Sequence, residues 1–368
     1  MKFSLRFFFA VLSILIYGQL LSQPVDWPNV NKTELNNLVW QSMSEYQIPG
    51  AQVVLFTKNK VKYSFSGGVA NVKTLEPITP KTSFETASLS KPVFHLILRK
   101  LVERGALPST FFSDTLAKYI DTARYIRPAV EQYMKGLHEF LVFNEQYSQE
   151  WFYGITIKQL LTHTGGIVGI TASKPGFVFR PGQQFYYCDE CYILLQRVVE
   201  NYLDMSLQQL ADKYLPNQCK GVSHFAWNGS TTDYAYCHNA EMDFQRDIWK
   251  AKEGIAHGTL YASALKYAKF MQYVVNEKLW ELNHDTMKVT SQISWQPGWG
   301  IEMTEKGSIN WHWGNDGCYQ HYMAYMPGQD FGMIIFTNSN NGMAMSKSLA
   351  TQLYGFKFKA MSWVMGEE

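Results

Sequence analysis

A serine and a lysine three residues apart carry the first chemical signal in this chain. Ser88 and Lys91 stand in the run FETASLSK, where the pattern predicts that a helix begins. At that spacing both side chains lie on one helical face, with Cβ atoms about 5–6 Å apart. A serine hydroxyl needs a neighbouring base before it can act as a nucleophile, and a partly desolvated lysine can be that base. The pair is therefore a candidate acyl-enzyme site, although on an exposed helix the same spacing is usually only a solvated face.

A tyrosine and an aspartate two residues apart form a second candidate cluster. Tyr187 and Asp189 follow a turn, and in an extended segment they would point to the same side. A lysine cation nearby would lower the pKa of Tyr187 and let it shuttle protons. Asp189 could hold Lys91 by a charge-assisted hydrogen bond. A core tyrosine and a turn aspartate would explain the same residues without any chemistry.

A third cluster lies in the segment WHWGNDG near the end of the chain. His312 could orient the Tyr187 hydroxyl or contact a carboxylate of the substrate. Gly314 would let the backbone of a substrate approach the strand closely. The backbone N–H of Asn315, together with that of Ser88, could form an oxyanion hole. The alternative is a strand end that carries a packed pair of tryptophans.

The rest of the chain predicts the elements that must position these clusters. Strand patterns occur near both ends, and helical patterns lie between them. We expect helices over residues 31–46, 93–104, 127–140, 155–166, 192–201, 258–275 and 343–353. We expect strands over residues 51–56, 61–66, 299–303, 321–326 and 332–337. This order indicates a sheet assembled from the two ends of the chain, with a helical insertion that forms a second lobe.

The first residues have the pattern of an export signal. Lys2 and Arg6 precede an apolar run over residues 7–16, and a cut after Ser22 would follow it. The run is too short to span a bilayer, so we expect a periplasmic or secreted protein, with a retained anchor as the alternative. Loss of Lys2 and Arg6 would take the formal net charge from +2 to 0. A neutral chain lacks the basic field that nucleic-acid binding requires.

The five cysteines leave at least one thiol unpaired. Cys219 and Cys237 bracket a loop and could form a disulfide in an oxidising compartment. Cys188 and Cys191 form a C-x-x-C motif, which suggests a redox or zinc site. The chain has no second C-x-x-C and no thioredoxin-like pattern around this one, which argues against both.

The three clusters together resemble the serine β-lactamase and penicillin-binding-protein superfamily, and in particular its class C-like branch. Residues 88–91 resemble its nucleophile motif, residues 187–189 its Tyr-x-Asn motif, and residues 312–314 its Lys-Thr-Gly motif in the His-x-Gly form. The resemblance covers nearly all of the chain after residue 22. Supporting segments that match in order are PG at 49–50, LLTHTGG at 160–166, PG at 181–182, GWG at 298–300 and PG at 327–328.

The resemblance implies an α+β fold, in which an antiparallel sheet flanked by helices is joined to an inserted all-helical lobe. It places one catalytic domain over residues 23–368. The α/β lobe would comprise about 27–105 and 285–368, and the helical lobe about 106–284. The implied chemistry uses no metal and no organic cofactor.

The same resemblance assigns roles to the candidate residues. Ser88 would attack a carbonyl of a small-molecule or peptide acyl substrate, and Lys91 and Tyr187 would relay its proton. The supporting residues would be Asp189, His312, Gly314 and Asn315. His163, inside the LLTHTGG segment, is expected to be structural.

Two departures from the family pattern bear on the substrate. Asp189 replaces an asparagine, which should favour the charged form of Lys91 and shift the role of base to Tyr187. His312 replaces a lysine, which weakens recognition of a carboxylate near neutral pH. Both changes favour an esterase or peptidase over a dedicated β-lactamase.

We therefore expect an exported serine hydrolase that cleaves an ester or amide, with D-amino-acid peptides among the candidates, through an acyl-Ser88 intermediate. The alternatives are an acyltransferase that uses the same intermediate and a slow-turnover penicillin-binding sensor. A metal or redox enzyme built on Cys188 and Cys191 is the alternative from another class.

Overall fold

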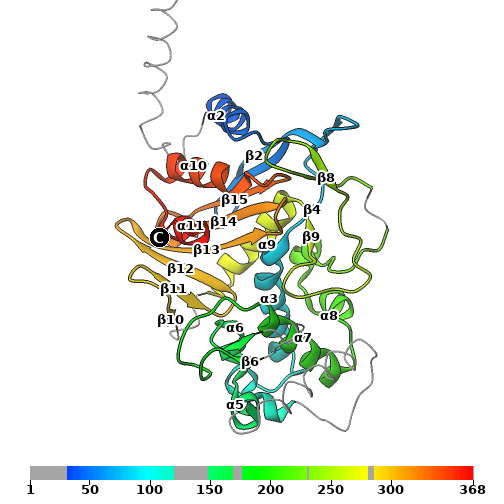
Figure 1. The fold of residues 1–368 in the computed structure, drawn as a ribbon, viewed down its shortest axis with the longest axis vertical. Helices are drawn as coiled ribbons and strands as arrows, with labels where there is room; N and C mark the ends of the chain where they lie inside the picture. Colours follow the sequence, from blue (N-terminus) through cyan, green and yellow to red (C-terminus); the bar gives the residue numbers. More distant parts are fainter. Residues whose placement is uncertain (1–30, 120–147, 169–175, 230–231, 281–285, 368) are drawn as a thin grey trace, which may run out of the picture.

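A nine-stranded sheet dominates the computed structural model, which describes residues 31–119, 148–168, 176–229, 232–280 and 286–367 (Figure 1). The strand order is β10-β11-β12-β13-β14-β15-β1-β2-β3, and all neighbouring strands are antiparallel. From the N-terminal end come β1 (Gly50–Phe56), β2 (Val61–Asn71) and β3 (Glu76–Pro77). From the C-terminal end come β10 (Met287–Lys288), β11 (Ile293–Gln296), β12 (Trp299–Thr304), β13 (Gly307–Asn315), β14 (Gln320–Met326) and β15 (Phe331–Thr337).

Strand β1 joins the two ends of the chain in the middle of the sheet. It pairs with β15 on one side, where Val53 lies opposite Ile335, and with β2 on the other. All seven residues of β1 are buried because both of its faces are covered. Successive side chains of a strand point to opposite faces, so Val53 belongs to one hydrophobic core and Val54 to the other.

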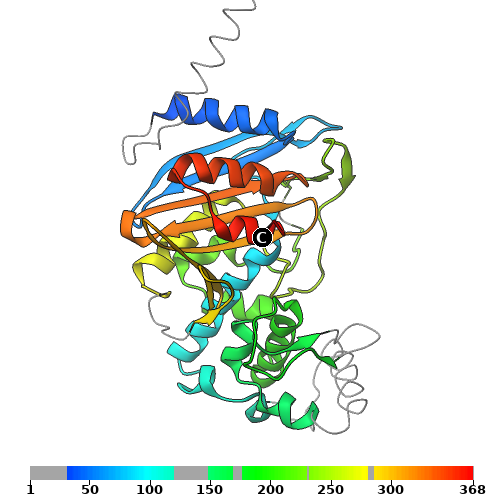
Figure 2. The ribbon, with the colours of Figure 1, turned by 60° about the vertical axis from the view of Figure 1, so that its left-hand side comes forward.

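The two faces of the sheet are covered by different helices (Figure 2). The face with Val53 packs against α2 (Lys32–Glu45), α10 (Gly342–Tyr354) and α11 (Lys359–Val364). The face with Val54 packs against α3 (Ser90–Glu103) and α9 (Ala264–Asn276). The α+β fold class predicted from the sequence, with an antiparallel sheet between helices, is confirmed.

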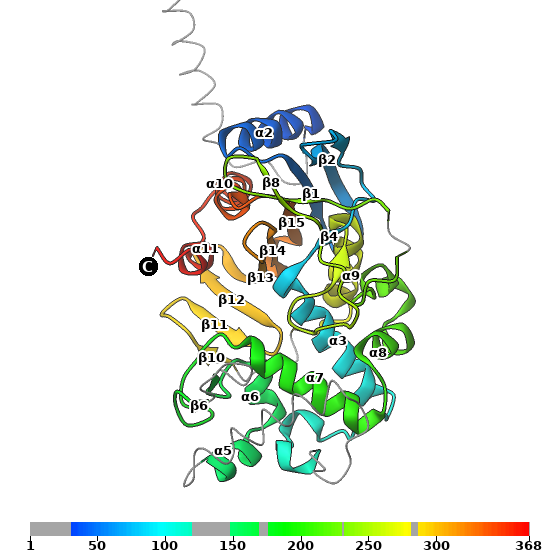
Figure 3. The same cartoon turned by 45° about the vertical axis from the view of Figure 1, so that its right-hand side comes forward.

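The middle of the chain adds helices beside α3 (Figure 3). These are α5 (Ser148–Gly154), α6 (Ile157–Leu161), α7 (Asp189–Leu203) and α8 (Leu207–Tyr214). Three small two-stranded sheets complete the described strands: β4 (Phe84–Glu85) with β9 (Tyr261–Ala262), β5 (Ile167–Val168) with β6 (Gly176–Phe177), and β7 (Cys237–His238) with β8 (Phe244–Arg246). Within the described ranges, no helix combines the length and the apolar character needed to cross a bilayer.

Two predicted helices are shorter than the sequence pattern indicated. The helix predicted over 155–166 ends at Leu161, because His163 takes a left-handed φ of +57° two residues later. The helix predicted over 258–275 begins at Ala264, where the Ser263 hydroxyl caps it. The preceding residues form β9 instead. The helix predicted over 127–140 and the export signal over 1–22 lie outside the described residues.

The predicted pairing of Cys219 with Cys237 is wrong. Cys237 is bonded to Cys318, 81 residues away in sequence, whereas Cys219 is buried as a free thiol. Cys188 and Cys191 are bonded to each other. In the part of the chain that the structure describes, no group of three or more His, Cys, Asp or Glu side chains could hold a metal ion.

Candidate active site

The turn that carries Ser88 is a short 3-10 helix, η1 (Ala87–Leu89), between β4 and α3. Ala87 has a left-handed φ of +48°, a conformation that costs a non-glycine residue about 1–2 kcal/mol. Hydrogen bonds hold the turn in this shape. The Thr86 N–H donates to the Leu260 carbonyl at 2.8 Å, and the Ser90 hydroxyl donates to the Ala87 carbonyl at 2.6 Å. The turn therefore presents the Ser88 side chain in a fixed position, with 9% of the residue exposed.

Lys91 lies one turn further along, and its side chain is fully buried. Its ammonium nitrogen is 2.8 Å from the Ser88 hydroxyl, to which it donates a hydrogen bond. It also donates to the His257 carbonyl at 3.3 Å and forms an ion pair with Asp189 at 2.6 Å. The structure thus brings Ser88, Lys91 and Asp189 together as predicted.

The pKa of Lys91 depends on its burial as well as on Asp189. Burial lowers the pKa of Lys91, and the attraction of Asp189 only partly offsets that effect. For Asp189, burial acts to raise the pKa, but the nearby Lys91 and His257 outweigh it and bring the pKa to about 2. The effect expected of Asp189 itself has the predicted direction, since its charge raises the pKa of Lys91, but burial lowers that pKa by more, so Lys91 remains a candidate base. The sequence could not show that the lysine side chain is completely buried.

Tyr187 lies in an aromatic enclosure beside Lys91. Its ring stacks on His163 at 4.3 Å and lies 4.6 Å from the Trp313 ring and 4.7 Å from the Lys91 nitrogen. Burial raises its pKa well above 10, the charge of Asp189 adds to this rise, and the adjacent Ser88 hydroxyl opposes it. The predicted lowering of this pKa by the lysine cation is therefore wrong. A neutral phenol at this position can donate or pass on a proton, but it is a poor base.

The residues predicted around the third cluster lie at the end of β13. His312 is buried, and its Nδ1 donates to the Trp313 carbonyl at 2.8 Å. Burial and the charge of Lys91 lower its pKa to about 3, so it is neutral near pH 7. Its Nε2 forms no hydrogen bond within the described residues, and the predicted contact with the Tyr187 hydroxyl is not made. The Asn315 side chain accepts from the Gly317 N–H at 2.9 Å.

Gly314 has a structural role that the sequence did not suggest. A Cβ at this position would lie 2.2 Å from the Thr86 carbonyl oxygen, closer than any side-chain contact allows. Strand β13 therefore touches the backbone of the nucleophile turn. Gly314 therefore allows β13 to approach the backbone of Thr86, whereas the sequence suggested the approach of a substrate. This contact sets the distance between Ser88 and the end of β13.

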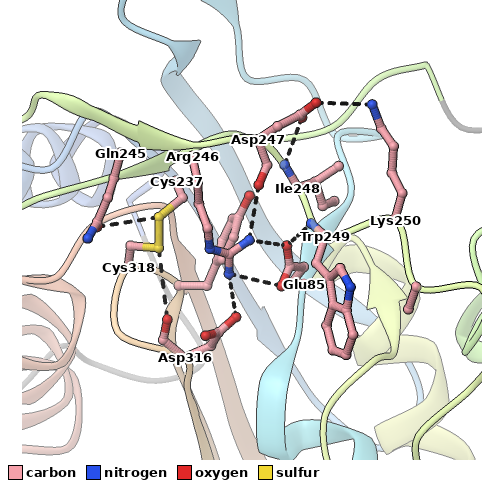
Figure 4. A network of polar contacts seen from close by, with 12 residues as sticks. Glu85, Cys237, Gln245, Arg246, Asp247, Ile248, Trp249, Lys250, Asp316 and Cys318 are labelled. Carbon is pink, nitrogen blue, oxygen red and sulfur yellow. Dashed lines mark hydrogen bonds and ion pairs between the residues drawn. A yellow bond between two sulfur atoms is a disulfide. The ribbon is translucent and has the colours of Figure 1, made fainter.

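An ion-pair network braces both sides of this contact (Figure 4). Arg246 donates to the two carboxylate oxygens of Glu85 at 2.7 and 3.1 Å and pairs with Asp316 at 2.5 Å. Glu85 precedes Ser88 by three residues, and Asp316 directly follows β13. The disulfide between Cys237 and Cys318 links β7, which pairs with the strand that carries Arg246, to the segment after β13. Sequence reasoning missed this network, because residues 85, 246 and 316 are far apart in the chain.

Two histidines complete the surroundings of the cluster. His163 Nδ1 accepts from the Cys188 N–H at 2.9 Å, so the structural role predicted for it is confirmed. His257 was missed: its carbonyl binds Lys91, and its Nδ1 lies 3.7 Å from the Asp189 carboxylate. Burial and the charge of Lys91 lower the pKa of His257 to about 4. The sequence could not identify His257, because the group that binds Lys91 is its backbone carbonyl, which every residue type carries.

Comparison with known proteins gives one family and a set of similar folds. The family model described as Beta-lactamase matches residues 35–354. "Protein flp" of Staphylococcus aureus (strain NCTC 8325 / PS 47) is 21% identical over an alignment of length 367. The alignment covers 89% of this chain and 68% of that protein.

Two solved structures share the fold at low identity. The octameric penicillin-binding protein homologue from Pyrococcus abyssi is 20% identical with a TM-score of 0.69, covering 89% of this chain and 78% of that one. The D-alanine carboxypeptidase AmpC from Burkholderia cenocepacia is 17% identical with a TM-score of 0.69, covering 88% of this chain and 99% of that one.

Proposed function

The chain belongs to the Beta-lactamase family, and from that premise we propose that it is a serine hydrolase that cleaves an ester or amide through an acyl-Ser88 intermediate. The observation that carries the proposal is the contact between Lys91 and Ser88. A buried amine with a lowered pKa lies 2.8 Å from a hydroxyl at the start of a helix. Members of this family are generally serine hydrolases, and this geometry is what such chemistry requires.

The first half of the proposed reaction forms the acyl-enzyme. Neutral Lys91 takes the proton of Ser88 while the Ser88 oxygen bonds to the carbonyl carbon of the substrate. Asp189, whose pKa of about 2 keeps it ionised, stabilises the ammonium that results. The bond to the leaving group then breaks, and the Tyr187 hydroxyl passes a proton from Lys91 to the leaving atom. The backbone N–H groups of Ser88 and Asn315 are the proposed donors to the oxyanion.

The second half releases the acyl group to water. Water gives a proton to Lys91 as it attacks the ester carbon of acyl-Ser88, the Ser88 oxygen leaves, and that oxygen takes the proton from Lys91 directly or through Tyr187. Among ester and amide substrates we favour peptides that contain D-amino acids. The support is the similar fold of the D-alanine carboxypeptidase, together with the neutral His312, which makes the site unlike that of a dedicated β-lactamase.

A fluorophosphonate probe tests the nucleophile directly. We expect the wild type to be labelled at Ser88 and Ser88→Ala to lose all labelling. Ser64→Ala, which changes an exposed serine on β2, is the matched control and should be labelled like the wild type. Labelling that persists in Ser88→Ala would refute the assignment.

Intact-mass measurements on ester, D-peptide and β-lactam substrates test the reaction. We expect steady turnover with a transient acyl adduct. A single burst without turnover would support the penicillin-binding sensor, and transfer of the acyl group to an added amine would support the acyltransferase.

We also propose that the protein is exported to the periplasm or secreted. The pattern of residues 1–22 supports this, and so do the two disulfides, since disulfides persist in oxidising compartments. Mass analysis of the N-terminus of protein from the native host should find a chain that starts at Gln23. An N-terminus that retains residues 1–22 would contradict it.

A further inference from the structure

A surface cavity of about 490 Å³ adjoins Tyr187. The loop before α7, the edge strand β10 and the helix α11 line it. The residues that matter for its chemistry are Phe185, Tyr186, Tyr187, Met287, Lys288 and Trp363. Because Tyr187 borders the cavity and its hydroxyl is adjacent to Ser88, the cavity lies within about one tyrosine side chain of the proposed nucleophile.

The aromatic wall of the cavity is built before any ligand arrives. The Trp363 ring lies 5.9 Å from Phe185 and 5.8 Å from Trp313, and Trp313 in turn lies 4.6 Å from Tyr187. Phe185 also packs against the fully buried Trp295 at 5.5 Å. A wall of mutually packed rings keeps its shape, which reduces the entropy lost when a ligand binds.

Helix α11 is fixed to the sheet at its first turn. The Glu302 carboxylate on β12 accepts hydrogen bonds from the Lys359 and Ala360 N–H groups at 2.9 and 3.0 Å. An acidic group at a helix N-terminus satisfies N–H groups that have no partner inside the helix. This cap holds Trp363, near the other end of the same helix, against the cavity.

The chemistry of the lining points to an apolar group with a negative charge. Six of the nine lining residues are aromatic or aliphatic, Gln183 and Gln184 add polar groups, and Tyr186 is 48% exposed. Among the described residues that line the cavity, Lys288 contributes the one formal charge. At the place where the family pattern has a lysine, His312 is neutral, so Lys288 offers a cation that the third cluster does not.

The position of Tyr187 indicates which part of the substrate would occupy the cavity. As a neutral phenol, Tyr187 passes the proton to the leaving atom, so the group beside Tyr187 is the leaving group. In an amide substrate the C–N bond breaks, the carbon stays on Ser88, and the nitrogen departs with the proton.

We propose that this cavity binds the leaving group of the substrate, and that this group is an amino acid with an aromatic or large apolar side chain and a free carboxylate. The side chain stacks between Tyr186 and Trp363, and the carboxylate meets Lys288. The proposal rests on the acyl-Ser88 mechanism, and it names a substrate class that the family relationship does not supply.

Protection of Ser88 from a fluorophosphonate probe tests the proposal without requiring a known substrate. The ligands are D-phenylalanine, L-phenylalanine, D-phenylalaninamide and D-alanine, each titrated against the rate of labelling. We expect at least one phenylalanine enantiomer to protect about tenfold better than D-alanine, since a filled apolar pocket discriminates by about that factor. Removal of the carboxylate charge in the amide should weaken protection several-fold.

Variants assign each part of this discrimination to a residue. Lys288→Gln should remove the difference between phenylalanine and its amide. Tyr186→Ala and Trp363→Leu should each weaken protection by phenylalanine about fivefold or more and leave D-alanine unchanged. Tyr186→Ala keeps the test valid if Trp363→Leu fails to fold, because the Tyr186 side chain is half exposed. Lys252→Gln and Met303→Ala change exposed residues elsewhere and should match the wild type.

Two results would overturn the inference. If Ser88 is labelled but no ligand protects it, or all ligands protect equally in the wild type and every variant, the cavity is not the subsite, while the hydrolase proposal stands. If wild-type Ser88 is not labelled at all, both proposals fail together.

Discussion

The serine side and the tyrosine side of the candidate site differ in how well their polar groups are matched. On the serine side, Lys91 has three partners, and hydrogen bonds to Leu260 and Ala87 clamp the turn around Ser88. On the tyrosine side, the Tyr187 hydroxyl is buried without a well-aligned hydrogen bond to any described residue, and so are Nε2 of His163 and Nε2 of His312.

This difference indicates which half of the site is preorganised before a substrate binds. An unmatched buried polar group costs about 1–3 kcal/mol. The nucleophile and its base are held by the protein alone, so they are preorganised for attack. On the tyrosine side, those donors and acceptors form no well-aligned hydrogen bonds with the described residues, and a substrate or water can form them instead. Four substitutions would break or sharpen this contrast.

Lys91→Met should have the largest effect. Methionine fills a similar volume but removes the base, so the rate of Ser88 acylation should fall on the order of 10³-fold. Thermal stability should fall, because Asp189 loses its ion-pair partner and the Ser88 hydroxyl and the His257 carbonyl lose a hydrogen-bond donor. Stopped-flow labelling and a melting curve would measure both quantities, with Lys81→Met, on the surface, as the control. A fall of less than tenfold would mean that Lys91 is not the base.

Gly314→Ala should be next, and it attacks the serine side through the backbone. The new Cβ would collide with the Thr86 carbonyl at 2.2 Å. Relief of the collision must move β13 or the nucleophile turn, so we expect about 100-fold less activity and a loss of about 1–3 kcal/mol in the free energy of unfolding. Gly328→Ala is the matched control, since a Cβ there meets nothing within 4 Å. Unchanged kinetics in Gly314→Ala would show that the turn tolerates displacement.

Tyr187→Phe should separate activity from stability. We expect turnover to fall about 10- to 100-fold, because the proton relay is lost. Removal of an unmatched buried hydroxyl should leave the free energy of unfolding unchanged or raise it by about 1 kcal/mol. Urea denaturation beside steady-state kinetics would test this pair of outcomes. A clear loss of stability would reveal that the hydroxyl has a strong partner, which would remove the contrast between the two sides.

Asp189→Asn should have the smallest effect and shift a pH profile. The Asp189 charge raises the pKa of Lys91 against the lowering effect of burial. Without that charge the lysine loses its proton at a lower pH. The acid limb of kcat/KM should therefore move to lower pH, while the rate on the plateau changes less. Movement of the limb to higher pH, or no movement, would show that Lys91 does not set it.

Local features of the site were predictable from the sequence. Ser88 and Lys91 are three residues apart, so helical geometry alone brings them together. The apolar, strand-like run of β1 and the strand patterns of the segments that form β12, β14 and β15 also identified the sheet without tertiary information. Each of these predictions depends on neighbours within a few residues, where spacing and structure are directly linked.

The missed features depend on burial and on contacts between distant segments. The direction of the pKa shift at Lys91 and at Tyr187 follows from complete burial, which a sequence does not display. The pairing of Cys237 with Cys318 and the bond from Lys91 to the His257 carbonyl each join residues more than 80 positions apart. Such contacts follow from the fold and have no signature in local spacing.

The position of helix α11 limits where an affinity tag can be attached for purification. Its Trp363 supports the rings that reach Tyr187, and only five residues of this sequence follow it. Glu367 lies four residues beyond Trp363, so a tag fused at this end would start close in sequence to the aromatic wall and could crowd it. A tag placed ahead of α2, which packs on β1, β2 and α10, keeps the recombinant protein suitable for kinetic work. A C-terminal tag behind a long flexible spacer serves the same purpose.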